Sequence, residues 1–119
     1  MRYVCLVYFD PSTAFDGSAK NNAVLGEAEA DRQRLLGRGI AAEALTLPNE
    51  AVTIRVRSGK LSRTDGPFME TKEVLGGFVL IEAGDLEEAV GIAAANPMAK
   101  LGSIEVRPLV DFSKPRPVL

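Results

Sequence analysis

The chain has 119 residues, a net charge of −2 and 46% hydrophobic residues, values that indicate a single globular domain with a modest core. Lysine and arginine are scattered among aspartate and glutamate, so the sequence lacks the basic stripe of a nucleic-acid-binding protein. No apolar run approaches the ~20 residues that span a bilayer, and no cleavable leader pattern precedes the first apolar run. We therefore expect a cytoplasmic protein that contacts neither nucleic acid nor membrane.

The sequence contains one cysteine, Cys5, and no histidine. A single cysteine cannot form an internal disulfide, and the lack of histidine excludes a histidine general base and every histidine-containing zinc site. Cys5 lies inside an apolar run, where a free cysteine behaves as a small buried side chain rather than a nucleophile. We expect neither a metal site nor a cofactor.

Residues 2–9 predict the first strand, because apolar side chains occupy both of its alternating faces. One face carries Tyr3, Cys5, Val7 and Phe9, and the other carries Val4, Leu6 and Tyr8. A strand with this pattern is covered on both sides. Residues 10–13 break the strand, and a polar loop is expected as far as Gly17.

Residues 18–38 predict a helix with a rough apolar stripe and a charged face. The candidate caps at its start are Ser18, Asn21 and Asn22, and the candidate terminators are Gly37 and Gly39. The charged residues are interpreted as a solvated helix face, made of Glu27, Glu29, Asp31, Arg32 and Arg34.

Residues 40–47 predict either a short extended edge or a loop, and Pro48-Asn49 turns the chain. Residues 51–57 then alternate in polarity, which predicts a strand with one wet face. Its side chains are expected to point inward at Val52, Ile54 and Val56, and outward at Thr53, Arg55 and Arg57. Ser58-Gly59 predicts a hairpin turn, after which residues 60–64 return antiparallel.

Residues 78–81 predict a second strand that is apolar on both faces. Asp85 and Glu88 form a capping box that begins a second helix, and Asn96-Pro97 ends it. Residues 103–109 alternate again and predict the last strand. We expect one domain over residues 1–110, followed by an extended tail over residues 111–119 that contains two prolines.

This order, β-α-β-β-β-α-β, predicts an α+β fold of the ferredoxin-like split βαβ type with an extra hairpin strand. In that arrangement the two strands with two apolar faces lie at the centre of an antiparallel sheet, and both helices cover one face. No element remains to cover the other face. We therefore expect the sheet of a second copy to cover it, which gives a homodimer in the form of a dimeric α+β barrel.

Several segments resemble the DGPF branch of the YCII-related proteins: Asp65-Gly66-Pro67-Phe68, Glu70-Thr71-Lys72-Glu73, Gly76-Gly77-Phe78 and Ser103-Ile104-Glu105-Val106-Arg107-Pro108. The resemblance extends over nearly the whole chain. It implies a dimeric α+β barrel, in agreement with the burial argument, and it implies no well-established activity.

Some YCII-related proteins carry a His–Asp pair in the barrel cleft, from which enzyme activity has been suggested. This sequence has no histidine and has Asn96-Pro97 where those relatives show Asp-Pro, so the pair is absent. Members of the DGPF branch are also often linked to extracytoplasmic sigma factors. That link implies a regulatory context.

The residues expected to bind a ligand surround a cleft between the motif loop and the sheet, and are Tyr8, Asp65, Glu70, Lys72, Glu105 and Arg107. Their charges suit a small polar or anionic ligand. Asp65 is the candidate general base, and it needs a raised pKa to act at neutral pH. The structural alternatives are a turn-forming role for Asp65, a solvated bend at residues 70–73, and ion pairing of Glu105 with Arg107.

Two functions follow as hypotheses. The first is a small-molecule-binding protein, or an enzyme that uses neither metal nor cofactor. The alternative is a protein-interaction module in transcription regulation, associated with sigma factors and without catalytic activity. In a third reading the polar cluster only rigidifies the dimer.

Overall fold

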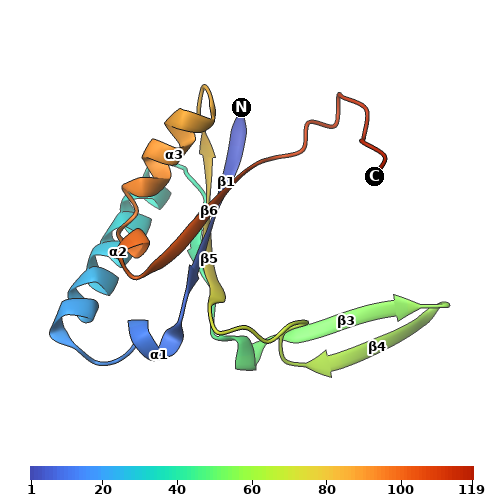
Figure 1. The fold of residues 1–119 in the computed structure, drawn as a ribbon, viewed down its shortest axis with the longest axis horizontal. Helices are drawn as coiled ribbons and strands as arrows, with labels where there is room; N and C mark the ends of the chain where they lie inside the picture. Colours follow the sequence, from blue (N-terminus) through green and yellow to red (C-terminus); the bar gives the residue numbers. More distant parts are fainter.

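The computed structural model describes residues 1–119 and contains a four-stranded antiparallel sheet with the strand order β2-β5-β1-β6 (Figure 1). The strands and helices, in chain order, are β1 (Arg2–Phe9), α1 (Pro11–Ala14), α2 (Ala19–Gly37), β2 (Ala42–Ala44), β3 (Val52–Arg57), β4 (Lys60–Asp65), β5 (Val74–Glu82), α3 (Leu86–Ala94) and β6 (Gly102–Pro108). Two 3₁₀ turns, Pro48–Glu50 and Pro97–Lys100, connect them. The long helices α2 and α3 lie on the same side of the sheet (Figure 1), and the predicted ferredoxin-like α+β class is confirmed. None of the helices is both long and apolar enough to cross a bilayer.

The central strands are β1 and β5, the two that the sequence marks as apolar on both faces. The β1 side chains that face the helices are between 2% and 7% exposed, and they are Tyr3, Cys5, Val7 and Phe9. Ala89 and Ala93 of α3 pack on the first half of this row, since alanines let a helix approach a sheet closely. Met98 and Ala14 pack on the second half.

The helix boundaries follow the predicted caps. The Ser18 hydroxyl accepts a hydrogen bond from the Asn21 N–H (3.2 Å) at the start of α2, and Gly39, with φ at +77°, follows its end. The Asp85 carboxylate accepts a hydrogen bond from the Glu88 N–H (2.8 Å) at the start of α3. In both helices the local capping chemistry fixes the ends.

The predicted polar loop after β1 was wrong, because residues 11–14 form the short helix α1. Pro11 occupies the first turn, where its missing N–H costs nothing, and the Asp10 carboxylate accepts a hydrogen bond from the Ser12 N–H (3.0 Å). Ala14 is fully buried. The proline that ends the strand therefore also begins a helix.

The hairpin β3–β4 forms a two-stranded sheet of its own and protrudes from the domain (Figure 1). The predicted turn is confirmed, since Ser58 and Gly59 both have positive φ. The inward orientation expected for the alternate apolar residues was wrong: Val52, Ile54 and Val56 are 43%, 63% and 59% exposed. Alternation determines which side chains share a face, but not whether another layer covers that face.

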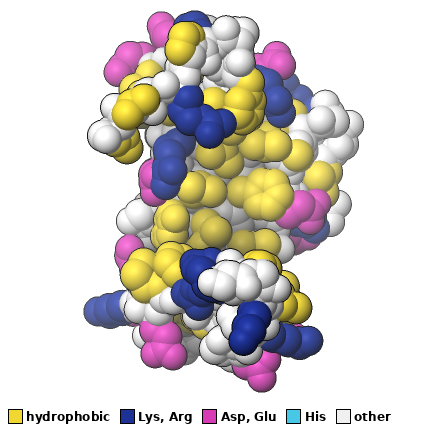
Figure 2. Space-filling view, turned by 90° about the vertical axis from the view of Figure 1, so that its right-hand side faces the viewer, with side chains coloured by type: hydrophobic (Ala, Val, Ile, Leu, Met, Phe, Trp, Pro, Cys, Tyr) yellow, Lys and Arg dark blue, Asp and Glu magenta, His cyan; other side chains and the backbone are white.

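The sheet face opposite the helices is uncovered in one chain, and we call it the open face. Strand registers place on it Val4, Leu6, Tyr8, Phe78, Leu80, Ser103, Glu105 and Arg107. Figure 2 shows this side as a broad hydrophobic surface, bounded below by the hairpin. The tail after β6 extends on the same side (Figure 1).

Candidate pocket between helix α2 and the sheet

Three of the ligand-binding residues predicted from the sequence lie together on the open face. The Arg107 Nε donates a hydrogen bond to the Glu105 carboxylate (2.5 Å), and this bond raises the pKa of Arg107. Tyr8 lies on the same face of the neighbouring strand β1, opposite Ser103 of β6. All three side chains reach solvent in one chain.

The other three predicted residues lie in a separate segment. Asp65 ends β4 opposite Val52, and the Gly66 N–H donates to the Ala51 carbonyl (2.7 Å), which closes the base of the hairpin. Glu70 and Lys72 are exposed on the loop of residues 66–73. No hydrogen bond or ion pair joins this segment to the group on β1 and β6, so one chain brings the six residues together only as two groups of three.

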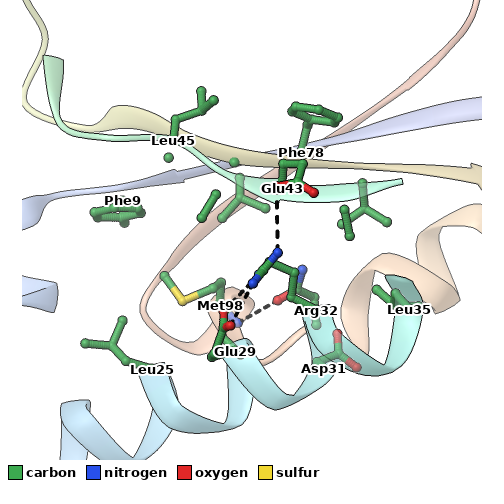
Figure 3. Close-up of a pocket in the computed structure, with 18 of the residues that line it drawn as sticks. Phe9, Leu25, Glu29, Asp31, Arg32, Leu35, Glu43, Leu45, Phe78 and Met98 are labelled. Atoms are coloured by element: carbon green, nitrogen blue, oxygen red, sulfur yellow. Dashed lines mark hydrogen bonds and ion pairs between the residues drawn. The ribbon is translucent and has the colours of Figure 1, made fainter. Parts of the chain in front are cut away.

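The structure contains a pocket that sequence reasoning missed, and none of the six predicted residues lines it. It has a volume of about 250 Å³ and lies between α2 on one side and strands β2 and β5 on the other (Figure 3); we call it the α2–sheet pocket. Twelve of its 19 lining residues are hydrophobic, among them Phe9, Phe15, Leu25, Leu35 and Met98. Leu45 and Phe78 also border the pocket, but their side chains point away from α2 (Figure 3). The pocket exists because α2 buries none of its residues fully against the sheet.

Two glycines let other groups come close to β5 beside this pocket. Gly76 is an extra residue in the β1–β5 register, and a Cβ atom there would lie 1.9 Å from the Phe9 ring. A Cβ atom on Gly77 would lie 2.7 Å from the Glu43 carbonyl of β2. Only glycine fits at these two positions while Phe9 and β2 keep their places.

Arg32 of α2 is the only basic side chain of the lining. Its Nε and Nη2 donate hydrogen bonds to the two carboxylate oxygens of Glu29 (2.9 and 2.7 Å), and Gln33 donates a third bond to Glu29 (3.1 Å). The bonds from Arg32 and then Gln33 lower the pKa of Glu29 from 4.5 to about 2. The bond with Glu29 in turn raises the pKa of Arg32. Both side chains are therefore charged across the physiological pH range.

A second carboxylate, that of Glu43 on β2, lies 3.7 Å from Arg32 Nη1. This is an ion pair but exceeds hydrogen-bonding distance. Asp31, also at the pocket, pairs with Arg34 of its own helix. The lining has no Ser, Thr, Cys, Tyr or Lys side chain, so its chemistry is that of an apolar cavity with one arginine and nearby carboxylates. Such a lining can hold an apolar molecule and orient a charged group on it.

The interpretation of the charged residues of α2 as a solvated helix face was therefore wrong for Arg32 and Asp31, whose side chains are only 25% and 17% exposed. The sequence spacing of Arg32 relative to the apolar residues of α2 could have indicated this burial. Leu25, Ala28, Arg32 and Leu35 follow one another at intervals of three, four and three residues, which puts all four on one face of a helix. An arginine within an apolar stripe indicates a partner or a ligand inside the fold.

Comparison with known proteins identifies relatives along almost the whole chain. A family model described as the YCII-related domain matches residues 1–113. An uncharacterized protein of Rhizobium meliloti (strain 1021) is 36% identical over 117 residues, which cover 94% of each chain. The family expected from the motifs is confirmed, and assignment to the DGPF branch stays a prediction.

Proposed function

The chain belongs to the YCII-related family, and from that premise we propose that it is a homodimer that binds a small molecule in the α2–sheet pocket. The observation that supports binding is the pocket itself, about 250 Å³ in volume, mainly apolar and with one arginine. Ligand sites commonly combine apolar walls with a few polar groups that orient the ligand, in volumes from roughly 300 Å³ upward. The α2–sheet pocket is close to the lower end of that range.

The open face supports the dimer. Val4, Leu6, Phe78 and Leu80 lie side by side there with no element of the same chain above them. Burial of a fully exposed side chain of this size contributes about 1.5–3 kcal/mol. These four side chains are already half-buried in one chain, so a second copy that covers the face gains a fraction of that amount from each. The exposed apolar row of the hairpin, at Val52, Ile54 and Val56, enlarges the surface available to a partner. A two-fold axis pairs the same face on both copies.

The six residues predicted from the sequence form a separate part of the proposal. Tyr8, Glu105 and Arg107 lie on the open face, and the hairpin that carries Asp65 protrudes on that side (Figure 1). In a two-fold dimer the segment of Asp65, Glu70 and Lys72 from one copy can approach the open face of the other. We propose that the two groups then contact a small polar or anionic ligand, with Asp65 as the candidate general base of a cofactor-independent enzyme.

Binding in the α2–sheet pocket is tested by thermal denaturation in the presence of a library of small metabolites. In the Ala28→Phe variant a ring fills the pocket, because Ala28 lines it from α2. In the control, Ala30→Phe, the same ring lies on an exposed position of the same helix. We expect ligands to raise Tm in the wild type and the control but not in Ala28→Phe. Equal responses in all three proteins would exclude the pocket as the site.

The second proposed site, between the open face of one copy and the Asp65 segment of the other, is tested with the same library. We expect Arg107→Ala and Asp65→Asn to abolish the response to polar or anionic ligands and to leave the dimer intact. A response that neither substitution changes would remove these residues from the site.

A second candidate function is an interaction module in transcription regulation. It is favoured by the loop of residues 66–73, where Phe68 and Met69 are 73% and 59% exposed. A photoreactive residue at position 68 separates the two candidates. Cross-linking to a second copy supports burial of the loop in the dimer, and cross-linking in cells to a transcription regulator, identified by mass spectrometry, supports the module.

A further inference from the structure

We infer that the ligand of the α2–sheet pocket is a small carboxylate with an apolar body, held by the free edge of the Arg32 guanidinium in place of Glu43. The inference rests on the proposed function, because it concerns the same pocket. Its evidence is different, since it comes from the geometry of three charged side chains.

The first observation is that only one edge of the guanidinium is used. Glu29 binds the edge formed by Nε and Nη2, at 2.9 and 2.7 Å. Nη1 makes no hydrogen bond, and its nearest carboxylate oxygen, on Glu43, is 3.7 Å away. The edge formed by Nη1 and the second hydrogen of Nη2 is therefore free. Two parallel N–H groups on such an edge match the two oxygens of a carboxylate.

The second observation is that this edge is held in place before any ligand arrives. Glu29 makes two bonds to Arg32 and accepts a third from Gln33, and its pKa of about 2 keeps it ionised. Figure 3 shows Arg32 rising from α2 toward Glu43 and the sheet. A cation that is already oriented loses little conformational freedom when it binds, which favours affinity.

The third observation distinguishes a carboxylate ligand from an amine. The Arg32 side chain is 25% exposed, whereas the side chains of Glu29 and Glu43 are 54% and 53% exposed. Arg32 is thus more buried than either carboxylate that contacts it, and Glu43 is half-exposed on the short strand β2. The remaining carboxylate of the lining, Asp31, is 17% exposed but is neutralised by its ion pair with Arg34. Glu43 has no other ion-pair or hydrogen-bond partner, so it can turn to solvent when a ligand carboxylate takes the free edge.

The fourth observation concerns the apolar body. The rings of Phe9 and Phe15 meet edge to face with centroids 5.4 Å apart, and Leu25 and Met98 lie beside them in the lining. A volume of about 250 Å³ holds roughly eight groups the size of a water molecule at ~30 Å³ each. The ligand is therefore an aryl or short alkyl carboxylate of about eight to ten non-hydrogen atoms.

The test is titration calorimetry with three probes of one shape and different charge: phenylacetate, phenylacetamide and phenethylamine. We expect the wild type to bind phenylacetate most tightly. Arg32→Lys keeps the positive charge but removes the two parallel N–H donors of the guanidinium. We therefore expect it to weaken phenylacetate binding about tenfold and to change phenylacetamide binding little. Glu43→Gln removes the competing carboxylate, so we expect it to tighten phenylacetate binding about threefold.

Circular dichroism and Tm measurements show whether each variant remains folded, and Glu43→Gln tests the inference without altering Arg32. Preferred binding of phenethylamine, or weaker phenylacetate binding in Glu43→Gln, would overturn the carboxylate assignment. If phenylacetamide binds the wild type at least as tightly as phenylacetate does, and does not bind Ala28→Phe, the pocket stands while the carboxylate assignment fails. If none of the probes binds the wild type, both the assignment and the pocket fail.

Discussion

Gly76 offers a direct test of how closely β1 and β5 approach beside the pocket. It is the additional residue where the register changes from Val7–Gly77 to Tyr8–Leu75. A Cβ atom at position 76 would lie 1.9 Å from Cε1 of Phe9 and 2.8 Å from Cδ1 and Cζ. Atoms in a packed interior do not approach this closely, so Gly76→Ala requires the Phe9 ring to move.

The cost follows from the surroundings of that ring. Phe9 is 7% exposed and is in edge-to-face contact with Phe15, so displacement disturbs a packed pair. Forcing an extra methyl group into a packed site costs about 1–3 kcal/mol. A domain of this length loses roughly 3–6 °C of Tm per kcal/mol, so we expect a fall of about 3–18 °C. The space next to the ring is the α2–sheet pocket, so phenylacetate affinity should fall as well.

The assay is thermal and urea denaturation of the wild type, Gly76→Ala and Gly91→Ala. Gly91 lies in α3, and apart from its neighbours along the helix no atom lies within 4 Å of the place that an alanine methyl group would occupy, so alanine should stabilise the helix. The expected gain is about 0.5–1 kcal/mol, because alanine has the higher helix propensity. The same glycine-to-alanine substitution is thus expected to lower stability at position 76 and to raise it at position 91. A Gly76→Ala protein as stable as the wild type would refute the close approach.

Three further predictions concern other parts of the molecule. The pKa of Glu29 is lowered from 4.5 to about 2, so its ionised form stabilises the fold. This stabilisation is complete above pH 4.5 and is lost as the pH falls toward 2. We therefore expect Tm to fall less between pH 4.5 and pH 2 in Glu29→Gln than in the wild type. An equal fall of Tm in the two proteins would contradict this. Leu6→Lys on the open face should give the 12.7 kDa mass of one chain in light scattering, whereas Leu36→Lys on the outer side of α2 should keep the dimer; a dimer in both would count against the interface. The Cys5 thiol, 2% exposed and with its pKa raised by burial, should react with a thiol reagent only in denaturant, and rapid native reaction would show that β1 is accessible.

The central layer of the fold could be predicted because its signals are local and strong. Both faces of β1 are apolar, which is the pattern of a strand inside a sheet, and the same holds for the end of β5. Ser18 and Asp85 marked helix starts through side-chain chemistry that acts within one turn. Ser58-Gly59 marked the hairpin in the same way.

The features that could not be predicted depend on where separate elements settle. The alternation of Val52, Ile54 and Val56 is identical whether the hairpin joins the sheet or stands apart from it. The α2–sheet pocket arises from the distance between α2 and β5, which no local pattern encodes. Arg32 was the available clue, because it interrupts an apolar stripe, yet as one of several charged residues on α2 it was interpreted as solvated.

Binding in the α2–sheet pocket is tested most directly by methyl NMR of the wild-type protein titrated with phenylacetate. We expect the perturbed signals to be those of Leu25, Ala28, Leu35 and Met98, which line the pocket, with Glu43→Gln shifting them at lower phenylacetate concentration. Perturbations confined to open-face methyl groups such as those of Leu6, or no perturbation at all, would contradict the proposed site.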